Sequence, residues 1–222
     1  MRSKSITEVL VASFFLLIVA TPIPVFGIAY YLNSSAIFDD DTHMWDEIFV
    51  DKDISKNPGS QLEIVEGGWV EDLGAYGYSE VIFNGGSSIG NVNGFNMSTI
   101  TVNSGHIGGS IWTDASSTVE LKGGSFGSLR AFGSGVMYIY GSDFMVDGIS
   151  VNYGDSLRGY STNILDPYLL EGTITGTLQD GSALNSSFAI YKISACDIRV
   201  LAPEPSTLLL LGLGGLFLRR KR

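Results

Sequence analysis

Two histidines are the first residues to consider for catalysis or metal binding in this chain of 222 residues. His43 follows the three acidic residues Asp39–Asp41, and carboxylate oxygens of this kind can bind a cation. No second histidine lies at ligand spacing, which favours a charged surface over a metal site. His106 stands where neighbouring sequence repeats have serine, as expected for a variable residue that faces solvent. We therefore predict no metal site and no cofactor.

Calcium binding is a second possible role for oxygen-bearing side chains in this chain. The segment 51–63 has oxygen-bearing residues at alternate positions, as a calcium-binding loop does. However, Lys56 stands at the turn position that requires glycine, and Leu62 replaces the glutamate that binds calcium through both oxygens. We expect at most loose calcium binding, by Asp39–Asp41.

Carboxylates that cleave polysaccharides work in pairs, or together with a lysine or arginine. The acidic residues between positions 79 and 148 do not recur in register with the sequence repeat; they are Glu80, Asp114, Glu120, Asp143 and Asp147. We therefore predict that the protein is not an enzyme. Convergence of Asp114, Glu120 and Asp143 in the fold would instead favour a polysaccharide-degrading enzyme on a β-helix scaffold.

Aromatic side chains offer a second alternative, a carbohydrate-binding module or adhesin. Trp69, Trp112 and Tyr138 are the candidate contacts with sugar rings. A flat exposed platform of Trp112 and Tyr138 would favour this function. The simpler interpretation is that these side chains stabilise the fold or its surface.

The composition indicates which elements position these residues. The chain is 45% apolar and only 16% charged, and it has 28 glycines and 6 prolines, which favours β-structure with many turns over helices. Six of its 13 bases but only two of its 23 acids lie in the two end segments, so the interior has 7 bases and 21 acids. A surface this acidic repels nucleic acid, and we predict no nucleic-acid partner.

The interior of the chain consists of a sequence block that recurs several times. Val81, Ile100 and Val119 recur at a constant interval, and Gly86, Gly105 and Gly124 keep the same interval. Each block has alternating apolar residues, a glycine turn and a second apolar pair, and it is too small to bury its own apolar face. We predict an all-β protein with a short β-solenoid of about 18–19 residues and three short strands per coil. An antiparallel sandwich of short hairpins is the alternative.

Other regions flank this repeat. We assign residues 60–148 to the solenoid, 30–59 to an acidic N-terminal cap and 149–201 to a C-terminal β-strand region with a hairpin at Asp180-Gly181. Cys196, the only cysteine, is expected to be a buried strand residue, with an intermolecular disulfide as the alternative.

The N-terminus has the pattern of a secretory signal peptide, which we assign to residues 1–29. Arg2 and Lys4 precede the apolar stretch Val9–Ala20, and small residues follow it. An uncleaved anchor is the alternative, although the stretch is shorter than the roughly 20 apolar residues that span a membrane.

The C-terminus combines three features between Ala202 and Arg222. Pro203-Glu204-Pro205 comes first, the apolar run Leu208–Leu218 follows, and four bases end the chain: Arg219, Arg220, Lys221 and Arg222. We predict a transmembrane helix in this segment, with its bases on the cytoplasmic side. As a helix, however, the run is only about 17 Å long, against a hydrocarbon layer of about 30 Å, and its three glycines weaken it. Such a segment suits temporary attachment to the membrane.

These three features resemble the PEP-CTERM sorting signal of Gram-negative bacteria, over residues 202–222. The resemblance implies an exosortase in the inner membrane as the processing partner. It also implies transient anchoring in that membrane, followed by delivery to the cell surface or to an extracellular matrix of exopolysaccharide. A simple tail anchor and a buried C-terminal helix are the alternatives. We therefore predict an exported, non-enzymatic surface or matrix protein, in which Pro203, Glu204 and Pro205 serve as a substrate for processing.

Overall fold

The computed structural model describes residues 29–43, 45–51, 59–161 and 166–203, and this part of the chain is almost entirely β-structure. Its elements, in chain order, are β1 (Ala29–Leu32), β2 (Ala36–Phe38), β3 (Glu47–Val50), β4 (Gln61–Val65), β5 (Trp69–Val70), β6 (Asp72–Ala75), β7 (Glu80–Ser88), β8 (Val92–Gly94), β9 (Thr99–Thr113), β10 (Thr118–Leu121), β11 (Ser125–Ala131), β12 (Val136–Val146), β13 (Ile149–Ser150), the short 3₁₀ turn η1 (Leu157–Gly159), β14 (Leu169–Leu178), β15 (Ala183–Tyr191) and β16 (Asp197–Leu201).

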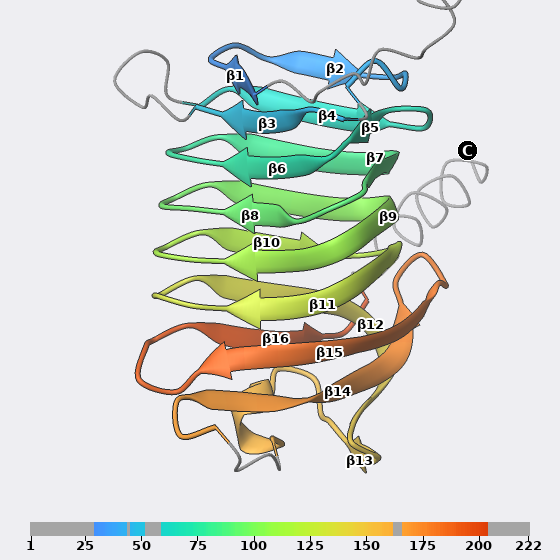
Figure 1. Ribbon diagram of the computed structural model, residues 1–222. Helices are drawn as coiled ribbons and strands as arrows, with labels where there is room; N and C mark the ends of the chain where they lie inside the picture. The colour runs from blue at the N-terminus through green and yellow to red at the C-terminus, as the bar shows by residue number, and fades with distance from the viewer. Residues whose placement is uncertain (1–28, 44, 52–58, 162–165, 204–222) are drawn as a thin grey trace, which may run out of the picture.

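The strands stack in coils that form two parallel sheets (Figure 1). The sheet that faces the viewer, which we call the front sheet, contains β1, β3, β6, β8, the second half of β9, β11 and β15. The rear sheet contains β2, β4, β10, β16 and the first parts of β7, β9 and β12. A third, short strand position connects the two sheets, where β5 pairs with the end of β7.

The register of these strands confirms the predicted period. Val81 lies opposite Ile100, and Ile100 lies opposite Val119, so that equivalent positions of the sequence repeat stack directly on each other. The next step, from Val119 to Met137, is slightly shorter and keeps the same alignment. The fold is a β-solenoid-like stack of about five turns. Because the stacked strands are parallel, the antiparallel sandwich is wrong for this region.

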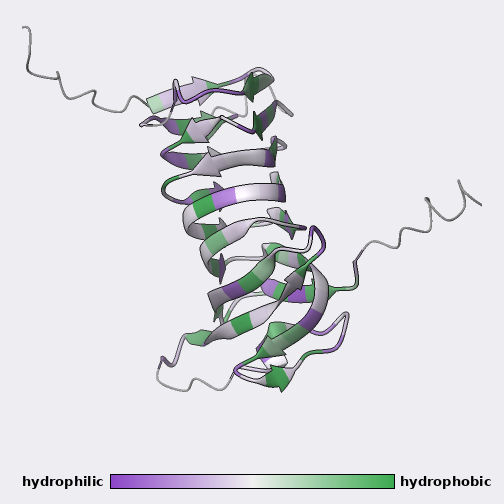
Figure 2. Ribbon diagram, turned by 90° about the vertical axis from the view of Figure 1, so that its right-hand side faces the viewer, coloured by the Kyte–Doolittle hydropathy of each residue, from purple (hydrophilic) through white to green (hydrophobic). Residues whose placement is uncertain are grey.

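The hydrophobic core lies between the two sheets. Alternate residues of each strand point inward, and those inside are at most 2% exposed: Leu62, Val81, Ile100, Val119, Met137 and Ile198 from the rear sheet, and Leu73, Val92, Ile111, Leu129 and Phe188 from the front sheet. The colour of each strand in Figure 2 changes along its length, as this alternation requires. No single coil could bury these side chains, so stacking provides most of the stability.

Glycine permits the close approach of neighbouring coils. Gly105 has a φ of 118°, and a Cβ atom there would lie 2.1 Å from the carbonyl oxygen of Gly86 in the preceding coil. At the opposite corner of each coil, a tight turn returns the chain from the front sheet to the rear sheet. The hydroxyl oxygens of Ser98 and Ser117 accept the backbone N–H groups of Phe95 and Asp114, which fixes these turns.

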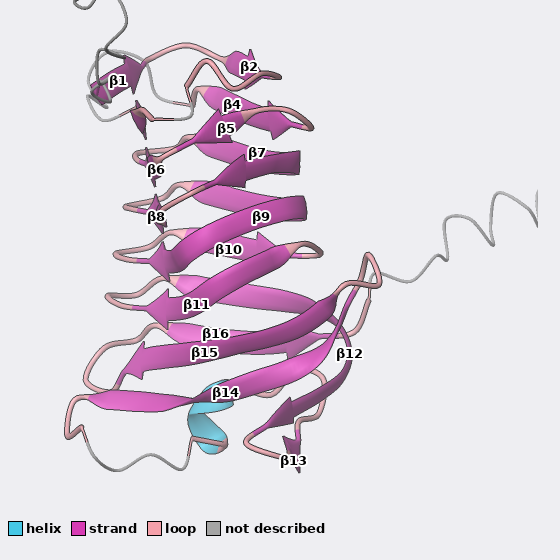
Figure 3. Ribbon diagram, turned by 45° about the vertical axis from the view of Figure 1, so that its right-hand side comes forward, coloured by secondary structure: helices cyan, strands magenta, loops and turns pink. Residues whose placement is uncertain are grey.

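The C-terminal end of the stack confirms the predicted hairpin and adds a long-range return. After Tyr140, β12 leaves the rear sheet and pairs antiparallel with β14, which forms a hairpin with β15. β15 then runs parallel to β11, with Phe188 opposite Leu129, and β16 runs parallel to the first part of β12. Figure 3 shows the hairpin and η1 at this end of the stack. These elements cover strand edges that would otherwise be exposed.

The N-terminal end is covered differently. The segment expected to form an acidic cap contains β1, β2 and β3, which stack in parallel on the coils below them. The ring of His43 stacks on Phe38 at 4.2 Å and meets Tyr30 edge-on at 4.9 Å, and its Nδ1 atom lies 2.9 Å from Asp46 Oδ2. His43 therefore packs over the end of the core. The interpretation of this residue as simple surface charge was wrong.

The predicted signal peptide, residues 1–29, lies outside the described residues except for Ala29, which begins β1. The predicted C-terminal helix falls on residues 204–222, which also lie outside them. In the part of the chain that the structure describes, there is no helix with the length and apolar character needed to cross a membrane.

Candidate functional site

The three carboxylates that could serve in catalysis lie in different parts of the stack. Asp114 begins a turn after β9, and its Oδ1 atom accepts the N–H of Ala115 at 2.5 Å. Glu120 lies on the rear sheet, where its Oε2 atom is 3.0 Å from Lys122 Nζ. Asp143 lies in the antiparallel part of β12 and accepts the hydroxyl of Ser142 at 2.9 Å. The arrangement that would have favoured a polysaccharide-degrading enzyme is therefore not present among these three residues.

The candidate metal ligands have structural contacts. His106 is exposed and lies opposite Ser125, with its Nδ1 atom 2.8 Å from that hydroxyl oxygen. Asp51, the first residue of the calcium-like segment, is buried and accepts the backbone N–H groups of Gly59 and Ser60 at 2.9 and 2.7 Å. Among the described residues, no group of three or more His, Cys, Asp or Glu side chains is arranged to hold a metal ion.

Cys196 is buried, as predicted, but it lies just before β16 and not in a strand. Its Sγ atom lies 3.1 Å from the carbonyl oxygen of Ala131. The guanidinium group of Arg158 donates to the backbone carbonyl groups around it, those of Tyr191, Lys192, Ser194 and Cys196. This contact attaches η1 to the last turn of the stack.

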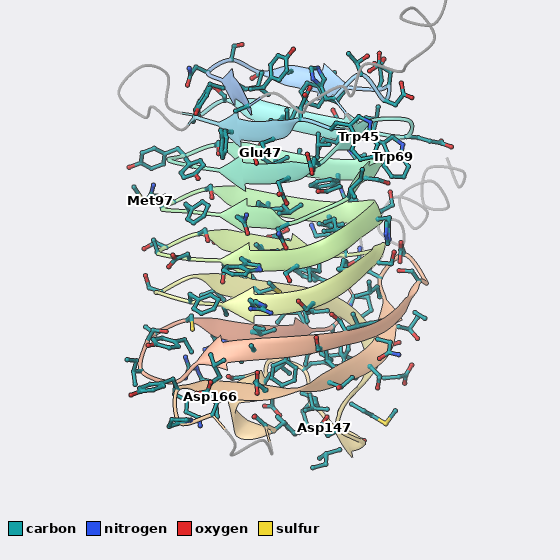
Figure 4. All side chains as sticks on the ribbon, in the orientation of Figure 1. Trp45, Glu47, Trp69, Met97, Asp147 and Asp166 are labelled. Atoms are coloured by element: carbon teal, nitrogen blue, oxygen red, sulfur yellow. The ribbon has the colours of Figure 1, made fainter. Side chains whose placement is uncertain are left out.

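The three aromatic residues proposed for sugar contact do not form one platform. Trp112 lies on the front sheet, Tyr138 on the rear sheet and Trp69 at the short third strand position. Figure 4 labels Trp69 at the right of the stack, away from Met97 in the turns at the left.

Instead, the front sheet carries a column of aromatic rings at one position of each coil, which we call the aromatic column. Tyr76 and Phe95 stack at 4.7 Å with an interplanar angle of 14°, and Phe132 lies 6.0 Å from Tyr191. The coil between them has Asp114 at this position, so the column is interrupted there. Positions 76, 95, 114 and 132 follow the coil period, so that aligning the repeats by position could have found this column from the sequence.

A hollow of about 450 Å³ lies at this interruption, and we call it the central hollow. It is lined by Asn91, Asn93, Phe95, Trp112, Asp114, Phe132, Gly133 and Tyr191. A second hollow shares Asn91, Asn93 and Phe95 with it and continues toward Glu47, which Figure 4 shows on the front sheet. A third shares Phe132 and continues toward Arg130, Asp147 and Glu171. Because they share lining residues, the three hollows lie next to one another across the strands of the front sheet, and we call this row the groove.

The aromatic side chains of this groove are half-buried. Burial raises the pKa of the Tyr76 hydroxyl above its ordinary value, and the neighbouring Tyr31 adds to the effect. The guanidinium carbon of Arg130 lies 5.1 Å from the centre of the Trp112 ring, within range of a cation–π interaction. Tyr76 is therefore a neutral hydroxyl at physiological pH.

The segment proposed for sorting leaves the stack directly. β16 ends at Leu201, which pairs with Tyr140, and Pro203, which follows closely, is exposed. The other residues assigned to sorting lie outside the described part of the chain; they are Glu204, Pro205, Arg219, Arg220, Lys221 and Arg222.

Residues 201–222 match the PEP-CTERM protein-sorting motif. This match confirms the resemblance of the C-terminal segment, and it indicates a protein that an exosortase sorts through the membrane to the cell surface. The PEP-CTERM match begins at the last residue of β16, so only Ala202 separates the folded stack from Pro203. No curated protein and no solved structure was found to be similar to this chain.

Proposed function

We propose that this protein is a non-enzymatic component of the cell surface or extracellular matrix, delivered there through exosortase processing of its PEP-CTERM segment. The observation that carries the proposal is the match of residues 201–222 to the sorting motif. A signal peptide at residues 1–29 opens the export route. The C-terminal helix then holds the chain in the inner membrane with Arg219–Arg222 inside, and Pro203-Glu204-Pro205 is presented outside as the processing substrate.

The geometry supports a structural role after delivery. The described chain is a stack of mostly parallel strands whose core side chains are almost completely buried. Such a stack is a rigid rod whose sides are available for contacts, and its stability comes from many similar coil interfaces. The acidic surface keeps a displayed protein of this kind soluble.

An enzyme remains the rival to test, because one end of the groove carries Arg130, Asp147 and Glu171. The Oδ1 atom of Asp147 accepts the N–H of Thr173 at 2.9 Å, and Arg130 packs against Trp112. These contacts favour a structural role for both residues. Release of new reducing ends from a polysaccharide, abolished by Glu171→Gln, would overturn the non-enzymatic part of the proposal.

Mass spectrometry of protein recovered outside an exosortase-containing cell tests the sorting part. We expect extracellular chains to lack everything beyond about Pro205. A variant with Pro203→Ala, Glu204→Gln and Pro205→Ala should stay in the membrane fraction with Arg222 intact. Glu66→Gln is the matched control, since Glu66 is exposed on a distant turn and its substitution removes the same charge. Extracellular wild-type protein that retains Arg222 would contradict the proposal.

A further inference from the structure

We infer that the groove on the front sheet binds a neutral glycan chain, with one sugar ring held in the central hollow against Phe95. The inference rests on the proposed function only for access, because export places this face in contact with extracellular polysaccharide. The binding itself depends on the described residues and is tested apart from sorting.

Where the aromatic column is interrupted, Phe95 has an open ring face on which a sugar can stack. One face of Phe95 is covered by Tyr76, and the other is directed along the stack toward the coil of Asp114. Among the described residues, no aromatic ring stacks on that second face. Phe95 and Phe132 are separated by two coils, which is roughly 9–10 Å at the usual spacing of neighbouring strands. On the far side of the interruption Trp112 lies 5.4 Å from Phe132, so the open face belongs to Phe95. A pyranose ring can pack its C–H face on Phe95 at about 3.5–4 Å.

The polar groups beside this ring have unused hydrogen-bonding capacity. Asn93 is half-buried, and within the described residues its side-chain amide has no hydrogen-bond partner. Only Oδ1 of Asp114 is engaged by Ala115, which leaves Oδ2 as an acceptor. On the rear sheet the corresponding amides are satisfied: Asn103 donates to Asn84 at 2.8 Å, and Asn84 donates to Glu63 at 2.6 Å. Free donors and acceptors next to an open aromatic face match the hydroxyl groups of a sugar.

The charge of the groove selects among glycans. Its lining residues include five carboxylates and one guanidinium group: Glu47, Asp72, Asp114, Asp147 and Glu171 against Arg130. This excess of negative charge repels uronate-containing and sulfated chains. The groove therefore suits a neutral polysaccharide.

The direction of the groove argues against a peptide. It crosses the strands of the front sheet from Glu47 to Tyr191, roughly 24 Å over five strand spacings. An extended peptide gains most of its affinity by pairing with a free strand edge, and the strands between β3 and β15 are paired on both sides. Linear glycans bind to side chains and need no backbone hydrogen bonds with a strand edge.

Asp114→Phe is the sharpest variant, because it places an aromatic ring between Phe95 and Phe132, where the column is interrupted. Phe95 and Phe132 occupy this position in the adjacent coils, so the substitution is compatible with the fold. It should fill the central hollow and weaken glycan binding at least 20-fold. Ser116→Phe is the matched control: it adds the same ring to an exposed residue of the same turn that does not line the groove, and it should leave affinity unchanged within 2-fold.

The measurement is isothermal titration calorimetry of the full chain, purified in detergent, with hexamers of cellulose, chitin, mannan and galacturonate. We expect at least one neutral hexamer to bind and the galacturonate hexamer not to bind. Asn93→Ala should weaken binding about 5- to 10-fold, whereas Asn103→Ala on the rear sheet should not change it. Circular dichroism of each variant verifies that it is folded.

Three outcomes would overturn the inference: no hexamer binds, the galacturonate hexamer binds instead, or binding is unaffected by Asp114→Phe. Binding of an arginine-rich peptide with displacement of the glycan would assign the groove to a protein partner. These binding results do not depend on sorting, because a failure of sorting would be seen only as extracellular protein that retains Arg222.

Discussion

Replacing Gly105 with alanine tests how the coils of this protein approach each other. Gly105 has a φ of 118°, and a Cβ atom at this position would lie 2.1 Å from the carbonyl oxygen of Gly86. Gly181, in the turn between β14 and β15, has a φ of 90° but no atom within 4 Å of the corresponding position. Gly105→Ala therefore combines backbone strain with a steric clash, whereas Gly181→Ala has the strain alone.

The two costs can be estimated separately. A residue with a Cβ atom at positive φ costs about 1–2 kcal/mol, and this cost applies to both variants. Overpacking against a backbone group that cannot rotate away adds about 1–3 kcal/mol. We expect Gly105→Ala to lower the free energy of unfolding by about 2–5 kcal/mol and Gly181→Ala by about 1–2 kcal/mol.

Urea unfolding followed by far-ultraviolet circular dichroism measures this difference as a shift in midpoint at constant slope. Equal shifts for the two variants would show that the contact between Gly105 and Gly86 does not limit the spacing of the coils. A smaller shift for Gly105→Ala than for Gly181→Ala would refute the reasoning entirely.

Three further predictions concern the turns and the C-terminal end. Ala115 has a φ of 50°, so Ala115→Gly should raise the free energy of unfolding by about 0.5–1 kcal/mol in the same assay, and no change would argue against strain in this turn. Arg158→Lys should lower it by about 2–3 kcal/mol, because an ammonium group cannot reach the carbonyl groups that the guanidinium group holds together; a shift below about 0.5 kcal/mol would show that η1 is not attached through this residue. The hydrogen bonds from Tyr160 and then from Asn152 hold the pKa of Asp155 below its ordinary value of 3.8, so its stabilising effect is present above that pH and is lost as the pH falls through the lowered value. Unfolding measured from pH 7 to pH 2 should therefore be less pH-dependent in Asp155→Asn, and identical profiles would contradict this assignment.

The coil period was predictable because it is a local property. Alternating apolar residues and a turn glycine recur at the same positions, and each coil repeats the same geometry. The return of β15 and β16 to the stack was not predictable in this way. Phe188 pairs with Leu129, and Ile198 with Met137, across stretches of sequence several coils long, so neither pairing follows from the spacing of the repeat. Long-range pairing of this kind is determined by packing around the whole core.

The candidate site was predictable in part. Trp112 does lie in the groove, but Tyr138 does not, because the sheet on which a residue lies depends on its position within the coil. The glycines and the apolar residues of the repeats reveal the period, but the aromatic column lies at the turns, where the residues vary more. The same alignment applied to Tyr76, Phe95 and Asp114 places them in one column and shows that the third is the exception.

The repeat that builds the fold also determines where a ligand can bind. Side chains at one position of successive coils form a column. In an unbroken column each side chain stacks on, or hydrogen-bonds with, its neighbours in the column. On the rear sheet Asn103 donates to Asn84 and Asn84 donates to Glu63, which leaves little capacity for a ligand. Where one coil departs from the pattern, its neighbours lose a partner on the side that faces it. Asp114 causes such a loss for Phe95, which has a stacked ring only on the side of Tyr76, and the central hollow lies at this coil.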